Sequence, residues 1–241
     1  MSKFKKEYRL SLRDMTIGFR TKTTTLLHDF EECFAQLCKK HNITGFDLNQ
    51  IGLMWVIANI NLEIKDELPI WDNNINIEIW FSEVKKSRAY LDFKIFHEDR
   101  LIAQGDSLWF VLNKKTRKPV PIDKIIAPCG HFEEIIFESH LKRIVHKEKM
   151  TKLCENKYTV NFNDLDFNGH VNNVSYVDWA IMNIPEEFIR QHTIKKYSVN
   201  FIQECFFNEN LNIITYKSDN TFYFEIVKDN NDIACTVEII C

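Results

Sequence analysis

Asn163-Asp-Leu-Asp-Phe-Asn-Gly-His-Val-Asn-Asn-Val-Ser-Tyr176 places carboxylate, amide and imidazole side chains between two apolar segments. The residues before it, 158–162, alternate large and polar side chains as a strand does. The residues after it, from Val171 onward, carry apolar side chains at helical spacing. We therefore expect the polar cluster at a strand-to-helix turn, where the first N–H groups of a helix lack partners. Such a turn can hold a carbonyl oxygen as it becomes negative, beside a carboxylate and an imidazole.

The same residue types also occur in turns that have no catalytic role. Asp, Asn and Gly favour turns, and Asn172 or Asn173 can serve simply as the N-cap of the following helix. Taken alone, this stretch leaves a structural turn and an active site equally open. The rest of the chain has to decide between them.

One motif within the stretch, Asp166-x-Asn168-x-His170-Val-Asn-Asn-x-x-Tyr176, resembles the active-site motif of the acyl-acyl-carrier-protein (acyl-ACP) thioesterases. A shorter core, Asp-x-x-Gly-His-Val-Asn-Asn-x-x-Tyr, also occurs in acyl-CoA thioesterases of the same fold. The motif is thus specific for thioester hydrolysis and less specific for the carrier of the acyl group.

A second stretch, Glu204-Cys205, resembles the other catalytic stretch of that family and lies at a similar separation from the motif. The resemblance covers nearly the whole chain and includes Trp71-Asp72 and Asn113-Lys-Lys-Thr-Arg117. It implies an enzyme that hydrolyses fatty acyl-ACP to a free fatty acid and ACP without a cofactor or a metal ion.

The resemblance assigns catalysis to Asp166, Asn168, His170 and Glu204. We expect Asp166 or Glu204 to activate a water molecule, and Asn168 and His170 to hydrogen-bond the water or the thioester carbonyl. Backbone N–H groups at the start of the helix would share the oxyanion. Gly169 departs from the plant members of the family, which usually carry Gln at this position.

Cys205 suggests a different mechanism, in which its thiol attacks the substrate and His170 acts as the base. We favour the simpler interpretation that Cys205 is a small buried apolar residue, as free cysteines often are. Because Cys205 directly follows Glu204, the two side chains should point to opposite faces of an extended strand.

The composition is that of an ordinary globular protein and excludes several classes. The chain has 241 residues, 45% of them hydrophobic, and a net charge of −3, which gives no reason to expect nucleic acid as a partner. Its seven cysteines form no C-x-x-C pair, which indicates reduced thiols and argues against a zinc site. The sequence also lacks G-x-S-x-G, G-x-G-x-x-G and Walker A patterns.

The distribution of apolar and charged residues along the sequence also bears on the location and partners of the protein. The basic N-terminus is not followed by an apolar region, and no apolar run approaches the length of a membrane span. We therefore expect a cytoplasmic protein. Lys85, Lys86 and Arg88, together with the Lys114–Lys118 turn, can either contact an acidic carrier protein or simply be solvated. A homodimer is also possible.

The order of expected elements occurs twice. A strand, a helix and four strands are predicted in residues 1–118 and again in 156–241, joined by a linker over 119–155 with a helix near Phe132–Ile144. This order and the motif together predict an α+β tandem hot-dog fold, in which each antiparallel sheet wraps one central helix.

Matching Tyr8 with Tyr158 places Thr16, Gly18 and Arg20 opposite the three motif residues. The first unit therefore lacks the catalytic set, and we expect one active site per chain, in the second unit. The helix over Thr24–Lys40 carries a regular apolar face, and three of its residues are expected to hold the acyl chain: Leu27, Phe30 and Phe34.

Two rival functions are less well supported. Hot-dog hydratases carry a signature similar to Asp-x-Asn-Pro-x-His, in which the His lies five residues after the Asp. Here Asp166 and His170 are four residues apart and no proline lies between them. A non-catalytic acyl-binding module would usually carry a separate DNA-binding region, and it would not need the Asp, Asn, His and Glu set. An acyl-CoA thioesterase of the same fold stays the nearest alternative.

Overall fold

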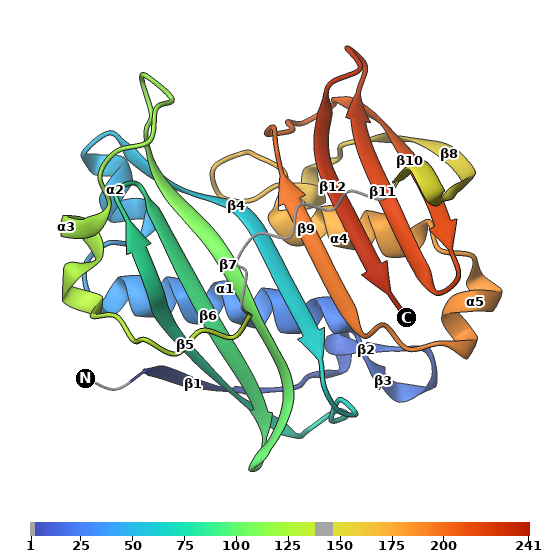
Figure 1. Cartoon of the computed structure of the whole chain (residues 1–241), viewed down its shortest axis with the longest axis horizontal. Helices are drawn as coiled ribbons and strands as arrows, with labels where there is room; N and C mark the ends of the chain where they lie inside the picture. The colour runs from blue at the N-terminus through green and yellow to red at the C-terminus, as the bar shows by residue number, and fades with distance from the viewer. Residues whose placement is uncertain (1–2, 138–146) are drawn as a thin grey trace. The chain divides into compact units, whose positions relative to one another are not determined.

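One antiparallel sheet and one principal helix make up each half of the chain in the computed structural model, which describes residues 3–137 and 147–241 (Figure 1). The chain divides into unit 1, Met1–Leu141, and unit 2, Lys142–Cys241. Within the described residues, no helix is long and apolar enough to cross a membrane.

Unit 1 contains a five-stranded sheet in the order β1-β5-β6-β7-β4, with every neighbouring pair antiparallel. A small two-stranded ladder, β2 with β3, precedes its main helix. The elements are β1 (Phe4–Arg9), β2 (Met15–Thr16), β3 (Arg20–Thr21), α1 (Thr23–Lys40), α2 (Gly45–Gln50), β4 (Leu53–Ile64), β5 (Asn74–Lys85), β6 (Arg88–His97), β7 (Arg100–Asn113) and α3 (Asp123–Ile126), with short 3-10 turns at η1 (Leu12–Asp14), η2 (Ile17–Phe19) and η3 (Ala127–Cys129).

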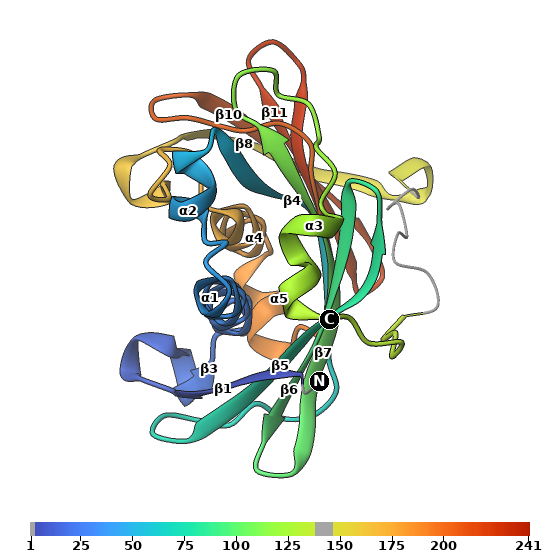
Figure 2. The same ribbon diagram turned by 90° about the vertical axis from the view of Figure 1, so that its left-hand side faces the viewer.

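The core of unit 1 lies between α1 and the sheet (Figure 2). Phe30 packs on Phe93 of β6 with ring centroids 4.2 Å apart, and Phe34 packs on Trp109 of β7 at 4.3 Å. Both helix residues are buried, as the apolar periodicity of α1 predicts. Alternation along the strands supplies the facing side chains, because every second residue of β5 and β6 points toward the helix.

Unit 2 repeats this plan, with the sheet order β8-β10-β11-β12-β9 and antiparallel pairing throughout. Its main helix, α4, contacts β12 and β10. The elements are η4 (Lys147–Lys149), β8 (Thr151–Thr159), η5 (Phe162–Asp164), α4 (Asn173–Met182), α5 (Glu186–Gln191), β9 (Lys196–Phe201), β10 (Asn210–Ser218), β11 (Thr221–Lys228) and β12 (Ile233–Ile240). Strand, helix and four strands occur in both units, so the predicted tandem hot-dog fold is confirmed.

Several predicted boundaries were wrong. The strand expected over 158–162 is the end of the longer β8, and residues Phe162–Asp164 form a 3-10 turn instead. Glu204 and Cys205 were expected in an extended strand, but β9 ends at Phe201 and both residues lie in the loop before β10. The helix α2 was not predicted. The expected linker over 119–155 contains α3, and its last residues already belong to β8.

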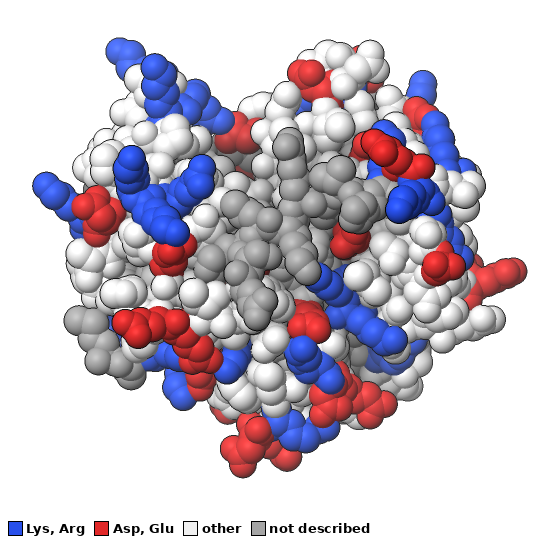
Figure 3. Space-filling view, viewed as in Figure 1, with Lys and Arg blue, Asp and Glu red and all other residues white. Residues whose placement is uncertain are grey.

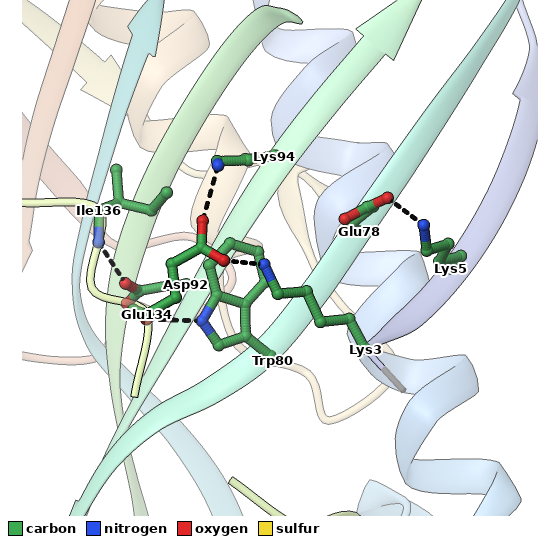
Figure 4. Close-up of polar contacts among 8 residues, drawn as sticks. All are labelled: Lys3, Lys5, Glu78, Trp80, Asp92, Lys94, Glu134 and Ile136. Atoms are coloured by element: carbon green, nitrogen blue, oxygen red, sulfur yellow. Dashed lines mark hydrogen bonds and ion pairs between the residues drawn. The ribbon is translucent and has the colours of Figure 1, made fainter. Parts of the chain in front are cut away.

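The segment 131–137 is not the start of the helix that was expected near Phe132–Ile144; residues 138–144 of that prediction lie outside the described residues. It runs along the sheet of unit 1 because side chains of the sheet bind its backbone (Figure 4). Trp80 Nε1 donates to the carbonyl oxygen of Glu134 at 2.8 Å, and the backbone N–H of Ile136 donates to Asp92 Oδ2 at 2.7 Å. Lys3 and Lys94 both pair with the Glu134 carboxylate.

Gly105 allows close packing in the sheet of unit 1. A Cβ atom at this position would lie 2.2 Å from both the ring of Phe93 and the carbonyl oxygen of Asn61. We expect Gly105→Ala to lower the free energy of unfolding by roughly 1–3 kcal/mol, because the ring that packs on Phe30 must move. Urea denaturation monitored by circular dichroism measures this change. Gln104→Ala, on the same strand, should shift the midpoint little; an unchanged midpoint for Gly105→Ala would contradict this packing.

Candidate active site

The turn between β8 and α4 is built on the carboxylate of Asp164, which is buried. Asp164 accepts hydrogen bonds from the Tyr158 hydroxyl at 2.9 Å and from the backbone N–H of Asn161 at 2.8 Å. Its backbone carbonyl accepts from the N–H of Asn172, the residue that caps α4. Asp164 therefore fixes the chain on both sides of the turn.

Asp166 holds the tip of the turn. Its Oδ1 accepts from the backbone N–H groups of Asn168 at 2.8 Å and His170 at 3.1 Å, and its Oδ2 accepts from Asn168 Nδ2 at 3.2 Å. The backbone N–H of Asp166 closes the turn by donating to the carbonyl oxygen of His170 at 2.7 Å. Gly169, at φ 79°, supplies the left-handed conformation that this tight turn requires. Three of the four predicted catalytic residues are thus joined in a turn of five residues, the Asn168 side chain and the His170 backbone both bonding the Asp166 carboxylate.

The fourth, Glu204, reaches the same place from the loop after β9. Its Oε1 lies 3.7 Å from Nδ1 of His170, and both side chains are about one quarter exposed, at 27% and 23%. The loop is held against the turn because the N–H of Val171 donates to the carbonyl of Cys205 at 2.9 Å. The distance of 3.7 Å between Oε1 and Nδ1 is longer than that of a hydrogen bond. Contacts between catalytic side chains often shorten only when the substrate binds.

Phe206 also contacts the site, and nothing in the sequence pattern had singled it out. Its ring meets the ring of His170 edge to face, with centroids 5.2 Å apart and planes at 86°. An isolated β-bridge joins the two residues through their backbones. Phe206 therefore limits the orientations that the imidazole can adopt.

Three of the backbone donors expected at the start of α4 are already occupied. The N–H of Val171 donates to Cys205, that of Asn172 to the carbonyl of Asp164, and that of Val174 to the Asn172 side chain. The helix begins two residues later than expected, and Asn172 is its N-cap. These three N–H groups are therefore not available to an oxyanion, whereas the side chains of Asn168 and His170 remain candidate donors for a carbonyl.

Cys205 points away from this cluster. It is fully buried, whereas Glu204 is partly exposed, so the two side chains face opposite directions although they lie in a loop. Burial raises the pKa of the Cys205 thiol, while a hydrogen bond with Tyr176 opposes the shift. A thiol with a raised pKa holds little of the thiolate form that attacks a carbonyl.

Unit 1 has an equivalent turn, 150 positions earlier in the sequence, that keeps the framework and lacks the reactive groups. Asp14 occupies the place of Asp164 and accepts the backbone N–H of Ser11 at 2.7 Å. The pair Met15 and Thr21 of the ladder corresponds to the bridge between Leu165 and Val171.

Both turns expose large apolar side chains at equivalent positions. Four of these residues lie on the turn and the neighbouring loop of unit 2, around the polar cluster, and four lie on the corresponding segments of unit 1. They are Phe162, Phe167, Phe206 and Phe207 in unit 2, and Leu12, Ile17, Ile70 and Trp71 in unit 1. The polar cluster of unit 2 thus lies at an open surface with an aromatic rim.

The three residues expected to hold an acyl chain are core residues of unit 1. Leu27, Phe30 and Phe34 are buried against the sheet. A cavity of about 260 Å³ lies at the end of α1, between Leu37, Phe81 and Phe132, and these three residues do not line it. Among the residues that the structure describes, no three His, Cys, Asp or Glu side chains gather as a metal ion would require.

Two family models match the chain. The model described as the acyl-ACP thioesterase N-terminal domain matches residues 1–128, and the acyl-ACP thioesterase C-terminal domain matches residues 147–240. Together they cover nearly all of the sequence, including both turns. The chain therefore belongs to the acyl-ACP thioesterase family.

Plant enzymes are among the relatives of this chain. A chloroplastic acyl-[acyl-carrier-protein] hydrolase of Cuphea viscosissima is 27% identical over 209 residues, which cover 81% of this chain and 50% of that protein. A chloroplastic oleoyl-acyl carrier protein thioesterase of Coriandrum sativum is 25% identical over 204 residues, 79% of this chain and 55% of that one. The chain thus spans about half the length of these relatives.

Solved structures share the fold over the full chain. An acyl-ACP thioesterase from Bacteroides thetaiotaomicron has a TM-score of 0.86 at 20% identity and covers 98% of this chain and 96% of its own. A 12:0-ACP thioesterase from Umbellularia californica has a TM-score of 0.86 at 17% identity, with the same coverage. At these identities the likeness establishes the tandem hot-dog fold.

Proposed function

We propose that this protein hydrolyses fatty acyl-ACP thioesters to a free fatty acid and ACP, with water activated by a carboxylate. The observation that carries the proposal is the meeting of Asp166, Asn168 and His170 with Glu204 in a chain of the acyl-ACP thioesterase family. Three of these residues, Asp166, Asn168 and His170, have no equivalent in the turn of unit 1, where Thr16, Gly18 and Arg20 stand instead.

The contacts favour Glu204 as the base. The Asp166 carboxylate already accepts three N–H groups, so its oxygens are engaged in holding the turn and the Asn168 amide. Asp166 therefore acts as the residue that orients Asn168, whose amide has a second N–H for the thioester carbonyl. Glu204, directly or through His170, takes the proton of the attacking water.

The reaction then balances in one addition and one elimination. Water oxygen bonds to the thioester carbon while its proton passes to the base, and the negative charge on the carbonyl oxygen is stabilised by Asn168 and His170. Collapse of this intermediate breaks the carbon–sulfur bond and expels the thiolate of the carrier, which takes up a proton. The products are a carboxylic acid and a free thiol.

The test compares carriers. Steady-state release of thiol is measured for one acyl group on ACP, on CoA and on N-acetylcysteamine. We expect kcat/KM to be highest for ACP. A higher kcat/KM for CoA would replace this proposal by acyl-CoA hydrolysis, and binding of acyl-ACP without any thiol release would make the protein a non-catalytic acyl-binding module.

We also propose that unit 1 accommodates the acyl chain along the face of α1 that carries Leu27, Phe30 and Phe34. Since these side chains are packed in the core, an acyl chain would have to displace them or extend from the cavity at the end of α1. Conservative changes of size, such as Phe34→Leu, should shift the preferred chain length, and by a graded amount, because one methylene discriminates by only ~1–3 kcal/mol. Activity profiles across chain lengths measure this. A folded variant with an unchanged profile would place the acyl chain elsewhere.

The predicted cytoplasmic location and homodimer belong to the same proposal. The names of the plant relatives include the word chloroplastic, which describes those proteins and not this chain. Sedimentation velocity of the purified protein measures its oligomeric state, and fractionation of the source cells measures its location.

A further inference from the structure

The loop after β9 ends in a tight turn over residues 206–209, and backbone hydrogen bonds hold this turn in place. The N–H of Glu209 donates to the carbonyl of Phe206 at 3.2 Å and closes the turn. Two further bonds join it to Val160, the residue after β8. The N–H of Asn208 donates to the carbonyl of Val160 at 3.0 Å, and the N–H of Val160 donates to the carbonyl of Glu209 at 2.9 Å. These contacts fix the backbone of the turn and involve no side chain.

Unit 1 contains the same turn with an uncharged residue in the place of Glu209. The N–H of Asn73 donates to the carbonyl of Ile70 at 3.3 Å and closes that turn. The N–H of Asp72 donates to the carbonyl of Leu10 at 3.0 Å, and the N–H of Leu10 donates to the carbonyl of Asn73 at 2.9 Å. The Asn73 side chain donates to the carbonyl of Ile70 at 3.1 Å. Because a neutral side chain suffices in unit 1, the charge of Glu209 is not needed to form the turn.

The carboxylate of Glu209 pairs with Lys228 at the end of β11. Nζ of Lys228 lies 3.0 Å from Oε2 and 3.3 Å from Oε1, and the pairing of Leu211 with Lys228 between β10 and β11 brings the lysine to this position. Many charged side chains of both signs stand at the surface (Figure 3), where ion pairs contribute little. This pair is better protected from solvent, because only 16% of the Lys228 side chain and 33% of the Glu209 side chain are exposed.

Both members of the ion pair also contact Phe206. Oε2 of Glu209 accepts the backbone N–H of Phe206 at 3.2 Å. Nζ of Lys228 lies 5.7 Å from the centroid of the Phe206 ring, within the range of a cation–π contact. The same ring meets the imidazole of His170 edge to face, with centroids 5.2 Å apart. The pair therefore holds, at its backbone and at its ring, the residue that contacts the imidazole.

We propose that Glu209 and Lys228 act as positioning residues for the active site of unit 2. By holding Phe206 in place, the pair keeps the imidazole of His170 turned toward Glu204. Glu204 precedes Phe206 by two residues in the same loop, so a shift of Phe206 also moves the carboxylate. This inference rests on the proposed function, since it gives the pair a part in that reaction. A misplacement of about 1 Å can cost on the order of 10²-fold in rate, although neither member of the pair has to touch the substrate.

The first test measures the reaction. Glu209→Ala, Lys228→Met and the double variant are compared with the wild type in steady-state hydrolysis of acyl-ACP. We expect kcat to fall about 10-fold in Glu209→Ala and by a smaller factor in Lys228→Met, with KM within about twofold of the wild type, because the lost groups position the site and do not bind the substrate. The double variant should lose no more than Glu209→Ala, since groups that act as a unit are not additive. Asn73→Ala, the equivalent change in unit 1, is the matched control and should keep the wild-type kcat.

The second test needs no substrate. The ring current of Phe206 shifts the NMR resonances of the carbon-bound protons of the His170 imidazole, and His170→Gln identifies these resonances in the spectrum. We expect them to move toward the positions of histidine in an unstructured peptide in Glu209→Ala and in Lys228→Met. They should stay in place in Asn73→Ala.

A folded Glu209→Ala protein with the wild-type kcat, or with unmoved His170 resonances, overturns the proposal, as does an equal loss of activity in Asn73→Ala. A fall in kcat that disappears on cooling the variant well below its unfolding temperature would show a purely structural role and overturn it as well. Should Glu209→Ala not fold, Lys228→Met carries both tests, because it keeps the acceptor of the Phe206 N–H. Should the wild type hydrolyse no thioester, the proposed function fails, and the His170 resonances still decide whether the pair holds the imidazole.

Discussion

Asp166→Ala and His170→Ala should each lower kcat by at least ~10²-fold while the protein stays folded. His170→Ala removes a hydrogen-bond donor, and Asp166→Ala removes the carboxylate that positions the donor Asn168. Asp166 joins the two halves of the turn and accepts an N–H of Asn168, so its loss releases the amide that we propose as a donor to the thioester carbonyl. His170 is held between Glu204 and the Phe206 ring. Steady-state thiol release and far-UV circular dichroism on the same preparations measure the two effects.

The repeat offers a matched control for this experiment. Thr16 occupies the position of Asp166 in the turn of unit 1, so Thr16→Ala changes the equivalent turn and leaves the four candidate residues of unit 2 in place. We expect the activity of this variant to match that of the wild type. Near-native turnover in Asp166→Ala or in His170→Ala would show that the site has been assigned wrongly.

Glu204→Gln should cost on the order of 10²–10⁴-fold in kcat, whereas Cys205→Ala should keep most of the activity. The two residues are neighbours, but Glu204 lies 3.7 Å from His170 and Cys205 is fully buried with its thiol pKa raised by that burial. Gln keeps the size and polarity of Glu and removes its capacity to take a proton. The comparison is a pair of steady-state assays at matched protein concentration.

Cys205→Ala should also lower the free energy of unfolding by about 1 kcal/mol, because removing the buried thiol leaves a small cavity. The assays should therefore be run well below the unfolding temperature of the variant, with folding checked on each sample. A folded Cys205→Ala protein without activity would reverse the assignment and make Cys205 the nucleophile.

Periodic apolar residues made much of the fold predictable. The helix over Thr24–Lys40 was expected from Leu27, Phe30 and Phe34, and α1 spans Thr23–Lys40. Strand β8 was recognised only at its end. It lies at the edge of the unit 2 sheet, in the order β8-β10-β11-β12-β9, and most of its side chains are exposed. The alternation of apolar and polar residues on which the prediction depends is therefore missing from most of the strand. The helix α2 is short, and its only signal was the Thr44 and Asp47 capping box.

The candidate site was predictable as a set of residue types and less so in its geometry. The motif located Asp166, Asn168 and His170, and the separation of Glu204 followed from the family resemblance. Which donors remain for a carbonyl depends on hydrogen bonds between segments, such as Val171 N to Cys205 O, that no local pattern reveals. The contact of Phe206 with His170 likewise arises from the loop after β9 folding back on the turn.

Direct attack by water is tested most directly by a single turnover of acyl-ACP in H₂¹⁸O, quenched in acid at intervals and examined by mass spectrometry of both the fatty acid and the intact protein. The account predicts a fatty acid carrying one ¹⁸O atom, formed while the mass of the protein stays unchanged. A protein mass increased by one acyl group, or an unlabelled fatty acid from the first turnover, would show that a side chain attacks the thioester and would contradict the account.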